Sequence, residues 1–381
     1  MRICHVIDYF HTDVGYQEFF LAREQASAGH DVRVVSSTHR QHTVSVSGPD
    51  EARGSAELRD AGVDLVRLPA LQMGHDRAWL RGLGHAITAH RPDTVHVHGP
   101  FSPTTARAAR VCNRHDIALL VDNHIQDSIA PASMTVLGRT VYAAFRLAFG
   151  PMLRRSVDAW VANGPSEASF LSERLGVPVE RVELFPLAFD PAAFHYDEER
   201  RTKVRAARRW EDDLVVAVTG KLHPGKRVEV VAAAAEQLSR SDHVRLVIAG
   251  SIEPDYATTV KQAAPRLDGD GRVEIRPMLA QRELADLYLA SDVVVFARLP
   301  SISIYEATGT GARVLVGDGA FGRWLHSISE VVEPVALPDL ADHLSRVDQR
   351  GERSASAADV LGWPAVSAAF VARYERLRCA S

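Results

Sequence analysis

The chain alternates short runs rich in valine, isoleucine and leucine with longer segments whose apolar residues follow a helical period. A parallel strand needs a crossover, usually a helix, to reach its neighbour, so this alternation predicts repeated βαβ units. The expected fold class is therefore α/β with mostly parallel sheets. In the first half, strands are expected at 2–7, 31–36, 64–68, 94–98, 118–122, 159–162 and 182–185, with helices between them, for example at 17–28 and 135–155.

The alternation breaks once and then resumes, which predicts two domains. Turn formers cluster at 186–194, and a strongly charged stretch follows at 197–213. Further strands are then expected at 214–219, 245–249, 273–276, 293–296 and 313–316. Two doubly wound domains of this kind bind ligands at the carboxyl ends of their strands, and the interface between domains is a frequent ligand site.

Bulk composition excludes some classes of protein. Of the 381 residues, 46% are hydrophobic and 24% are charged, which is ordinary for a globular protein. The net charge of -4 gives no reason to expect a nucleic-acid partner. The three cysteines are widely spaced, and neither a signal peptide nor an apolar run of bilayer length is evident. We therefore expect a cytoplasmic protein.

A cation-rich loop is expected directly after the first strand of the second domain. Segment 220–226 reads Gly-Lys-Leu-His-Pro-Gly-Lys. Two ammonium groups at the carboxyl end of a strand can neutralise a diphosphate leaving group as its charge develops. The alternative is that Lys221 and Lys226 are solvated loop residues. The segment is not a Walker loop, because the glycine spacing and the final Lys-Ser/Thr pair are missing.

A carboxylate stands near the start of another expected helix. Glu306 begins the segment Glu-Ala-Thr-Gly-Thr-Gly-Ala-Arg-Val-Leu-Val at 306–316. If the helix begins near Ile304, the backbone N–H groups around Ser303 and Ile304 face an anion, and the Glu306 carboxylate can accept both hydroxyls of a ribose. The alternative is that Glu306 only complements the helix dipole in the first turn.

Together the two motifs resemble those of retaining glycosyltransferases of family 4, which have the GT-B fold. That family's pattern reads Gly-Arg-Leu, then Lys, and later Glu-Ala-Met-Ala-x-Gly-x-Pro-Val-Val. The resemblance implies two Rossmann-like domains facing each other across a cleft. It divides the chain into an acceptor-binding domain at 1–190, a nucleotide-sugar-binding domain at 191–362, and a C-terminal helix at 363–381 that crosses back to the first domain.

The resemblance also implies an activity and assigns residues to it. A sugar would move from a nucleoside-diphosphate sugar to a hydroxyl of a sugar, glycoconjugate or small-molecule acceptor, with retention of the anomeric configuration. Neither a metal ion nor a separate cofactor would be required. The catalytic residues would be His124, Lys221 and Lys226. The residues that bind the donor would be Gly15, Gly220, Met278, Ser303, Ile304 and Glu306.

Two departures from the family pattern keep other functions open. Arg298 stands where the family usually has a second glutamate, and only Gly15 remains of a glycine pair before the first helix. A nucleotide-sugar epimerase on the same fold is one alternative. A GT-B protein that binds but has lost catalysis is the other. The nucleotide base, the sugar and the oligomeric state are not specified by these motifs.

Two further features have a structural and a functional interpretation. His96 and His98 alternate on one expected strand, so both side chains point to one face. No third metal ligand is evident in the sequence, and packing roles are therefore expected for them. Segment 131–155 mixes apolar residues with arginines. A helix half-buried against the sheet is the favoured interpretation, and peripheral contact with the inner face of a membrane is the alternative.

Overall fold

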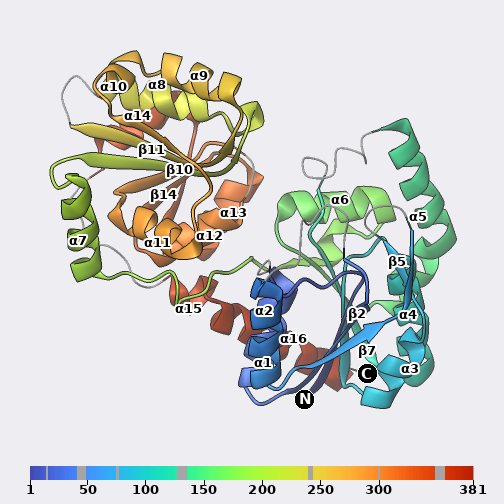
Figure 1. The fold of residues 1–381 in the computed structure, drawn as a ribbon. Helices are drawn as coiled ribbons and strands as arrows, with labels where there is room; N and C mark the ends of the chain where they lie inside the picture. The colour runs from blue at the N-terminus through green and yellow to red at the C-terminus, as the bar shows by residue number, and fades with distance from the viewer. Residues whose placement is uncertain are drawn as a thin grey trace. The chain divides into compact units, whose positions relative to one another are not determined.

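The computed structural model describes residues 1–13, 16–40, 49–73, 77–126, 135–238, 243–298, 301–347 and 357–380. The chain forms two compact units (Figure 1). Unit 1 comprises Met1–Pro186 together with Val366–Ser381, and unit 2 comprises Leu187–Ala365. The expected divisions at 190/191 and 362/363 lie close to these boundaries. Each unit is an α/β domain with a parallel sheet, which confirms the predicted fold class.

Seven parallel strands form the sheet of unit 1, in the order β3-β2-β1-β6-β7-β8-β9. The chain winds outward from β1 in both directions, as in a Rossmann-like domain, so the switch point lies between β1 and β6. The strands are β1 Arg2–Ile7, β2 Asp31–Ser37, β3 Asp64–Leu68, β6 Thr94–His98, β7 Ala118–Asn123, β8 Ala159–Ala162 and β9 Val182–Leu184.

Helices cover both faces of this sheet. Helices α3, α4 and α5 pack side by side, and α1 meets the C-terminal helix α16 through Gln25 and Tyr374. A short antiparallel hairpin, which was not expected from the sequence, adds β4 Ala70–Gln72 and β5 Ala78–Leu80. The helices are α1 Gln17–Ser27, α2 Pro49–Asp60, α3 Leu83–His90, α4 Pro103–His115, α5 Val136–Ser156, α6 Pro165–Leu175 and α16 Trp363–Ala380.

Unit 2 repeats the design with six parallel strands in the order β12-β11-β10-β13-β14-β15. Its switch point lies between β10 and β13. The strands are β10 Leu214–Leu222, β11 Val244–Ile252, β12 Val273–Arg276, β13 Val293–Phe296, β14 Arg313–Gly317 and β15 Val332–Val335. The helices are α7 Glu198–Arg208, α8 Val228–Leu238, α9 Pro254–Gln262, α10 Pro265–Gly269, α11 Gln281–Ala290, α12 Ile302–Gly309, α13 Ala320–Ile328, α14 Leu340–Ser345 and α15 Ala358–Leu361.

One strand of unit 2 differs from its expected length in a way that matters for the site. Strand β10 continues to Leu222, so Gly220 and Lys221 belong to the strand and the loop begins at His223. Gly220 pairs with Gly250 of β11, and both have positive φ angles, 124° and 145°. A Cβ atom on Gly250 would overlap with the carbonyl group of Gly220. The pairing therefore extends only because neither residue carries a side chain.

Strands buried on both faces explain the long apolar runs in the sequence. In unit 2, Val216 and Val218 of β10 pack on the α8 side, while Val215 and Ala217 pack on the α11 side. Burial of two faces is typical of parallel sheets, and removal of this much apolar surface from water is the main stabilising contribution. The core holds the strands in place, and the polar residues of the predicted site stand at the carboxyl ends of these strands.

Candidate functional site

The cation-rich segment and the carboxylate helix of unit 2 meet at its switch point. Gly220 lies beside the start of α12, since a Cβ atom built on it would be 3.9 Å from Ser301 Oγ. Ser301 caps the helix, and its Oγ accepts from the N–H of Ser303 at 3.4 Å. Helix α12 starts at Ile302, two residues before the expected Ile304. The N–H of Ile304 donates to the Ser301 carbonyl at 3.1 Å, so the cap itself uses both N–H groups that were expected to face an anion.

Glu306 lies in the second turn of α12, half-buried among residues of unit 2. Burial raises the pKa of its carboxyl group to about 7, although a hydrogen bond with the Ser303 hydroxyl opposes the shift. The hydroxyl of Tyr288 on α11 is close enough that the charge of Glu306, added to burial, raises the pKa of the tyrosine. Tyr288 in turn shares a 2.7 Å hydrogen bond with the hydroxyl of Thr219 on β10. A polar network therefore joins the end of β10 to Glu306.

The two lysines occupy different environments. Lys221 is exposed at the end of β10, and Lys226 is half-buried in a single 3-10 turn, Pro224–Lys226. Burial lowers the pKa of Lys226, as expected for an ammonium group partly removed from water. A cation in this position gains more from an arriving anion than a fully solvated one.

Other residues expected near the donor are distributed around the same edge of the sheet. Met278 follows β12 and is 64% exposed. The side chain of Ile304 is buried in the core. Arg298 is exposed after β13. Gly15 of unit 1 falls outside the described residues.

In unit 1, three imidazoles converge on one carboxylate oxygen. Oδ2 of Asp122, at the end of β7, is 2.9 Å from His96 Nε2, 2.7 Å from His98 Nδ1 and 3.0 Å from His124 Nε2. Burial would raise the pKa of Asp122, but the neighbouring imidazoles outweigh it and hold that pKa well below its ordinary value. Burial would lower the pKa of His124, but the charge of Asp122 raises it to about 9.

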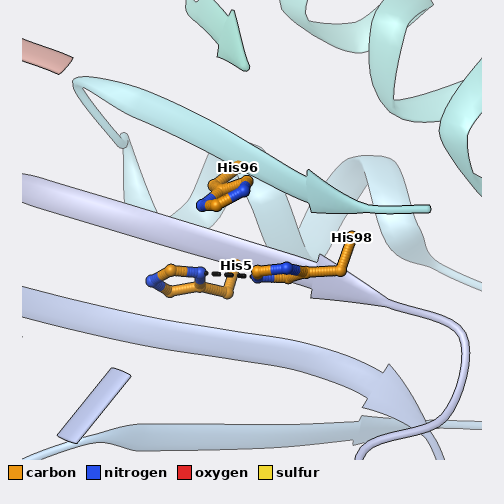
Figure 2. Close-up of side chains that lie close together, drawn as sticks. All are labelled: His5, His96 and His98. Atoms are coloured by element: carbon orange, nitrogen blue, oxygen red, sulfur yellow. Dashed lines mark hydrogen bonds between the residues drawn. The ribbon is translucent and has the colours of Figure 1, made fainter. Parts of the chain in front are cut away.

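A third histidine, which the sequence did not reveal, joins His96 and His98. His5 lies on β1 directly opposite His96 in the register, and its Nδ1 is 3.0 Å from His98 Nε2 (Figure 2). The three rings are close enough to share a metal ion. However, each of their six nitrogens already has a hydrogen-bonding partner, because Gln25 contacts His5 at 2.8 Å and Tyr374 contacts His96 at 2.7 Å. We therefore interpret the group as a hydrogen-bonded cluster.

Known proteins resemble this chain both in sequence and in fold. A family model described as "Glycosyl transferase 4-like domain" matches residues 20–188. A curated relative, the D-inositol 3-phosphate glycosyltransferase of Streptomyces coelicolor, is 24% identical over 335 residues, which cover 76% of this chain and 71% of the relative. These likenesses identify the chain as a glycosyltransferase similar to those of family 4.

Solved structures agree with the GT-B fold of this glycosyltransferase. HepE of Anabaena in complex with UDP matches with a TM-score of 0.70 and 15% identity, over 99% of this chain and 100% of that one. Sucrose-phosphate synthase of Thermosynechococcus elongatus matches with a TM-score of 0.61 and 15% identity, over the full length of both chains. At such identities the likeness concerns the fold alone.

Several polar residues of this glycosyltransferase were not singled out by sequence reasoning. Tyr288 and Thr219 look like ordinary core positions of a helix and a strand, and only their pairing in space reveals a network. In unit 1, Glu18 of α1 and Glu167 of α6 are buried, and burial raises the pKa of each carboxyl group. Both carboxyl groups also interact electrostatically with His124. The one signal in the sequence was their place in the first turn of a helix that follows a strand.

Proposed function

We propose that this glycosyltransferase moves a sugar from a nucleoside-diphosphate sugar to an acceptor hydroxyl, with retention of the anomeric configuration. The observation that carries the proposal is the convergence of the β10 end and α12 at the switch point of unit 2. A similar fold, HepE of Anabaena, has been crystallised with UDP and with UDP-glucose, which supports a donor of this class.

Each group at this switch point has a role that fits its chemistry. Lys221 and Lys226 would stabilise the diphosphate as negative charge develops on it. Glu306 would accept hydrogen bonds from the ribose hydroxyls, with Gly220 allowing close approach of the backbone. Met278, exposed beside the end of β12, would contact the base. Binding a diphosphate between cations in this way requires no divalent ion, and no separate cofactor is proposed.

The proposal assigns the acceptor to unit 1. The carboxyl edge of its sheet carries His124 with Glu18 and Glu167 nearby, together with Gln17, whose buried side chain has no hydrogen-bond partner among the described residues. Such groups suit a polyhydroxylated acceptor, because hydroxyls both donate and accept. The relative from Streptomyces coelicolor, named for D-inositol 3-phosphate, acts on a molecule of this kind.

The test is a screen of UDP-, GDP- and ADP-sugars for slow hydrolysis and for transfer to sugars and cyclitols, with the anomeric configuration followed by NMR. We expect one nucleotide to be preferred and the product to keep the donor's configuration. Activity should survive EDTA, because the two groups of described residues that could hold a metal both lie in unit 1. Inversion, or inhibition that only added metal reverses, would contradict the mechanism. If the sugar of the donor is epimerised, the protein is a nucleotide-sugar epimerase instead. If the donor binds and is not turned over, the protein is a GT-B protein that has lost catalysis.

We further propose that α5 rests on an anionic membrane surface. Among the described helices, none has the length and apolar character that crossing a bilayer requires. Yet Val136, Leu137 and Leu147 of α5 are 84%, 74% and 82% exposed, and Arg139 and Arg146 on the same helix are also exposed. Apolar side chains and arginines together suit an anionic lipid surface.

Sedimentation with lipid vesicles tests this contact. Vesicles that contain phosphatidylglycerol should retain the protein, and those of phosphatidylcholine alone should not. Leu137→Ser with Leu147→Ser should abolish the binding. Val179→Ser is the matched control, because Val179 is 54% exposed elsewhere in unit 1. Equal sedimentation of wild type with both kinds of vesicle would argue against the proposal.

A further inference from the structure

The three imidazoles on Asp122 are not equivalent. An ionised carboxylate only accepts hydrogen bonds, so His96 Nε2 and His98 Nδ1 must each carry a proton. The other nitrogen of His96 faces the hydroxyl of Tyr374 at 2.7 Å, and the other nitrogen of His98 faces His5 at 3.0 Å. The second nitrogens of both rings therefore have partners within the fold.

His124 differs from them in what its second nitrogen can do. Its Nε2 is buried at ion-pair distance, 3.0 Å from Asp122 Oδ2, without the alignment of a hydrogen bond, while 31% of the side chain is exposed. No partner for Nδ1 exists among the described residues. His124 is thus the imidazole of this cluster that forms an ion pair with Asp122 on one side and can donate a hydrogen bond on the other.

The cluster has rigid attachments on two helices. His5 reaches Gln25 of α1 at 2.8 Å, and His96 reaches Tyr374 of α16, whose ring lies beside Phe370. His5, His96 and Asp122 are fully buried (Figure 2 shows the rings of His5, His96 and His98). Buried hydrogen-bonded groups of this kind have few alternative rotamers, so the hydrogen bonds from His96 and His98 keep the Asp122 carboxylate in one position.

We propose that Asp122 is a positioning residue for the transfer reaction: its Oδ2 fixes the His124 ring and keeps it doubly protonated, so that Nδ1–H donates to an oxygen of the substrate. The hydrogen bond to a substrate oxygen rests on the proposed function, whereas the protonation of His124 does not. A cationic donor forms a stronger hydrogen bond than a neutral one, and the gain is largest where negative charge develops.

The charges around His124 agree with this role. Burial opposes the protonated ring, and Asp122 on β7, Glu18 on α1 and Glu167 on α6 favour it. The pKa of His96 is lowered to about 4 by burial, so that ring is neutral at physiological pH. The net effect on His124 is a pKa of about 9, and removal of the Asp122 charge would take away the largest contribution that opposes burial.

The first experiment is a titration of the full chain labelled with ¹⁵N-histidine, followed by NMR without substrate. The His124 resonances are identified by their absence in His124→Gln. In wild type they should titrate near pH 9, and in Asp122→Asn at or below the ordinary value of about 6.5. Asp158→Asn is the matched control, because Asp158 binds the N–H of Leu119 at the opposite end of the same strand and should leave the titration near 9.

The second experiment measures the pH dependence of kcat with the nucleotide-sugar that the screen identifies. The alkaline limb should move from about pH 9 to near 6.5 in Asp122→Asn, with kcat at pH 8 reduced at least about tenfold and KM for the donor little changed. A role that is only structural would lower activity at every pH without moving the limb. Because the titration needs no substrate, it can succeed even if the proposed donor is wrong.

Three outcomes would overturn the proposal. One is a His124 ring that is neutral at pH 7.5 in wild type, a measurement that does not depend on any variant folding. Another is a titration that is the same in Asp122→Asn and wild type. The third is stoichiometric binding of Zn²⁺ that shifts the resonances of His5, His96 and His98, because those nitrogens would then coordinate an ion instead of supporting Asp122.

Discussion

At the scale of single residues, Glu306 decides whether the nucleotide site has been located correctly. Glu306→Gln keeps the shape of the side chain and removes its charge. Hydrogen bonds to a charged group contribute about 1.5–3 kcal/mol each, so affinity for the nucleoside diphosphate should fall by one or two orders of magnitude. Calorimetry with UDP, GDP and ADP measures the change. Unchanged affinity for whichever nucleotide binds would place the site elsewhere.

The same residue predicts a pH dependence with a defined sign. The carboxyl group binds its proton more tightly when folded, with a pKa of about 7 against an ordinary 4.5, so its ionisation destabilises the fold as pH rises through that window. Glu306→Gln should therefore melt at a higher temperature than wild type at pH 8 and at a similar one at pH 4. Nucleotide affinity of wild type should rise with pH up to about 7. A flat profile in both measurements would contradict the assigned burial.

Lys226 gives a prediction about turnover. Its ammonium group is half-buried, and a cation facing developing phosphate charge contributes most in the transition state. Lys226→Ala should reduce kcat more than about tenfold with little change in melting temperature. Lys261→Ala is a suitable comparison, because Lys261 on α9 forms an exposed ion pair with Asp268. Normal turnover in Lys226→Ala would remove this lysine from the site.

At the scale of secondary-structure elements, the close pairing of β10 with β11 positions Lys221 and Lys226 at the carboxyl edge of the unit 2 sheet. Gly250→Ala should destabilise unit 2 by about 2–4 kcal/mol, because its φ is 145° and the new methyl group would overlap with the Gly220 carbonyl. Gly269→Ala on α10 is the control, since nothing lies within 4 Å of its Cβ position. Denaturant unfolding measures both, and equal stabilities would mean that the strands can separate here at little cost.

At the scale of the whole molecule, the C-terminal helix belongs to unit 1 although the chain passes through unit 2 before reaching it. Arg373 of α16 forms two 2.8 Å hydrogen bonds with the carboxylate of Glu183, and Tyr374 supports His96. Deletion of 366–381 should therefore expose unit 1 to hydrogen exchange, above all β1 and β6, while unit 2 still binds the nucleotide. Exchange that increases equally in both units would contradict this division.

Much of the architecture was predictable, because a parallel strand that is buried on both faces consists of consecutive apolar residues and is therefore recognisable in the sequence. Strands β1, β3, β6, β8, β12 and β13 have the expected bounds. The hairpin β4–β5 and the edge strand β15 were missed, since three or four residues without alternation carry little signal. The extension of β10 was missed because Gly220 looks like the start of a turn, and only its partner Gly250 makes pairing sterically possible.

The residues of the candidate site divide in the same way. Local order in the sequence determined that Lys226 follows β10 and that Glu306 lies in the helix after β13, because a βα unit puts such residues at the carboxyl edge of the sheet. Only the tertiary structure brought His5 beside His98, placed Tyr288 between Thr219 and Glu306, and directed three imidazoles at Asp122. These contacts join residues far apart in the chain, and their protonation depends on burial and neighbouring charge, which exist only once the sheets have formed.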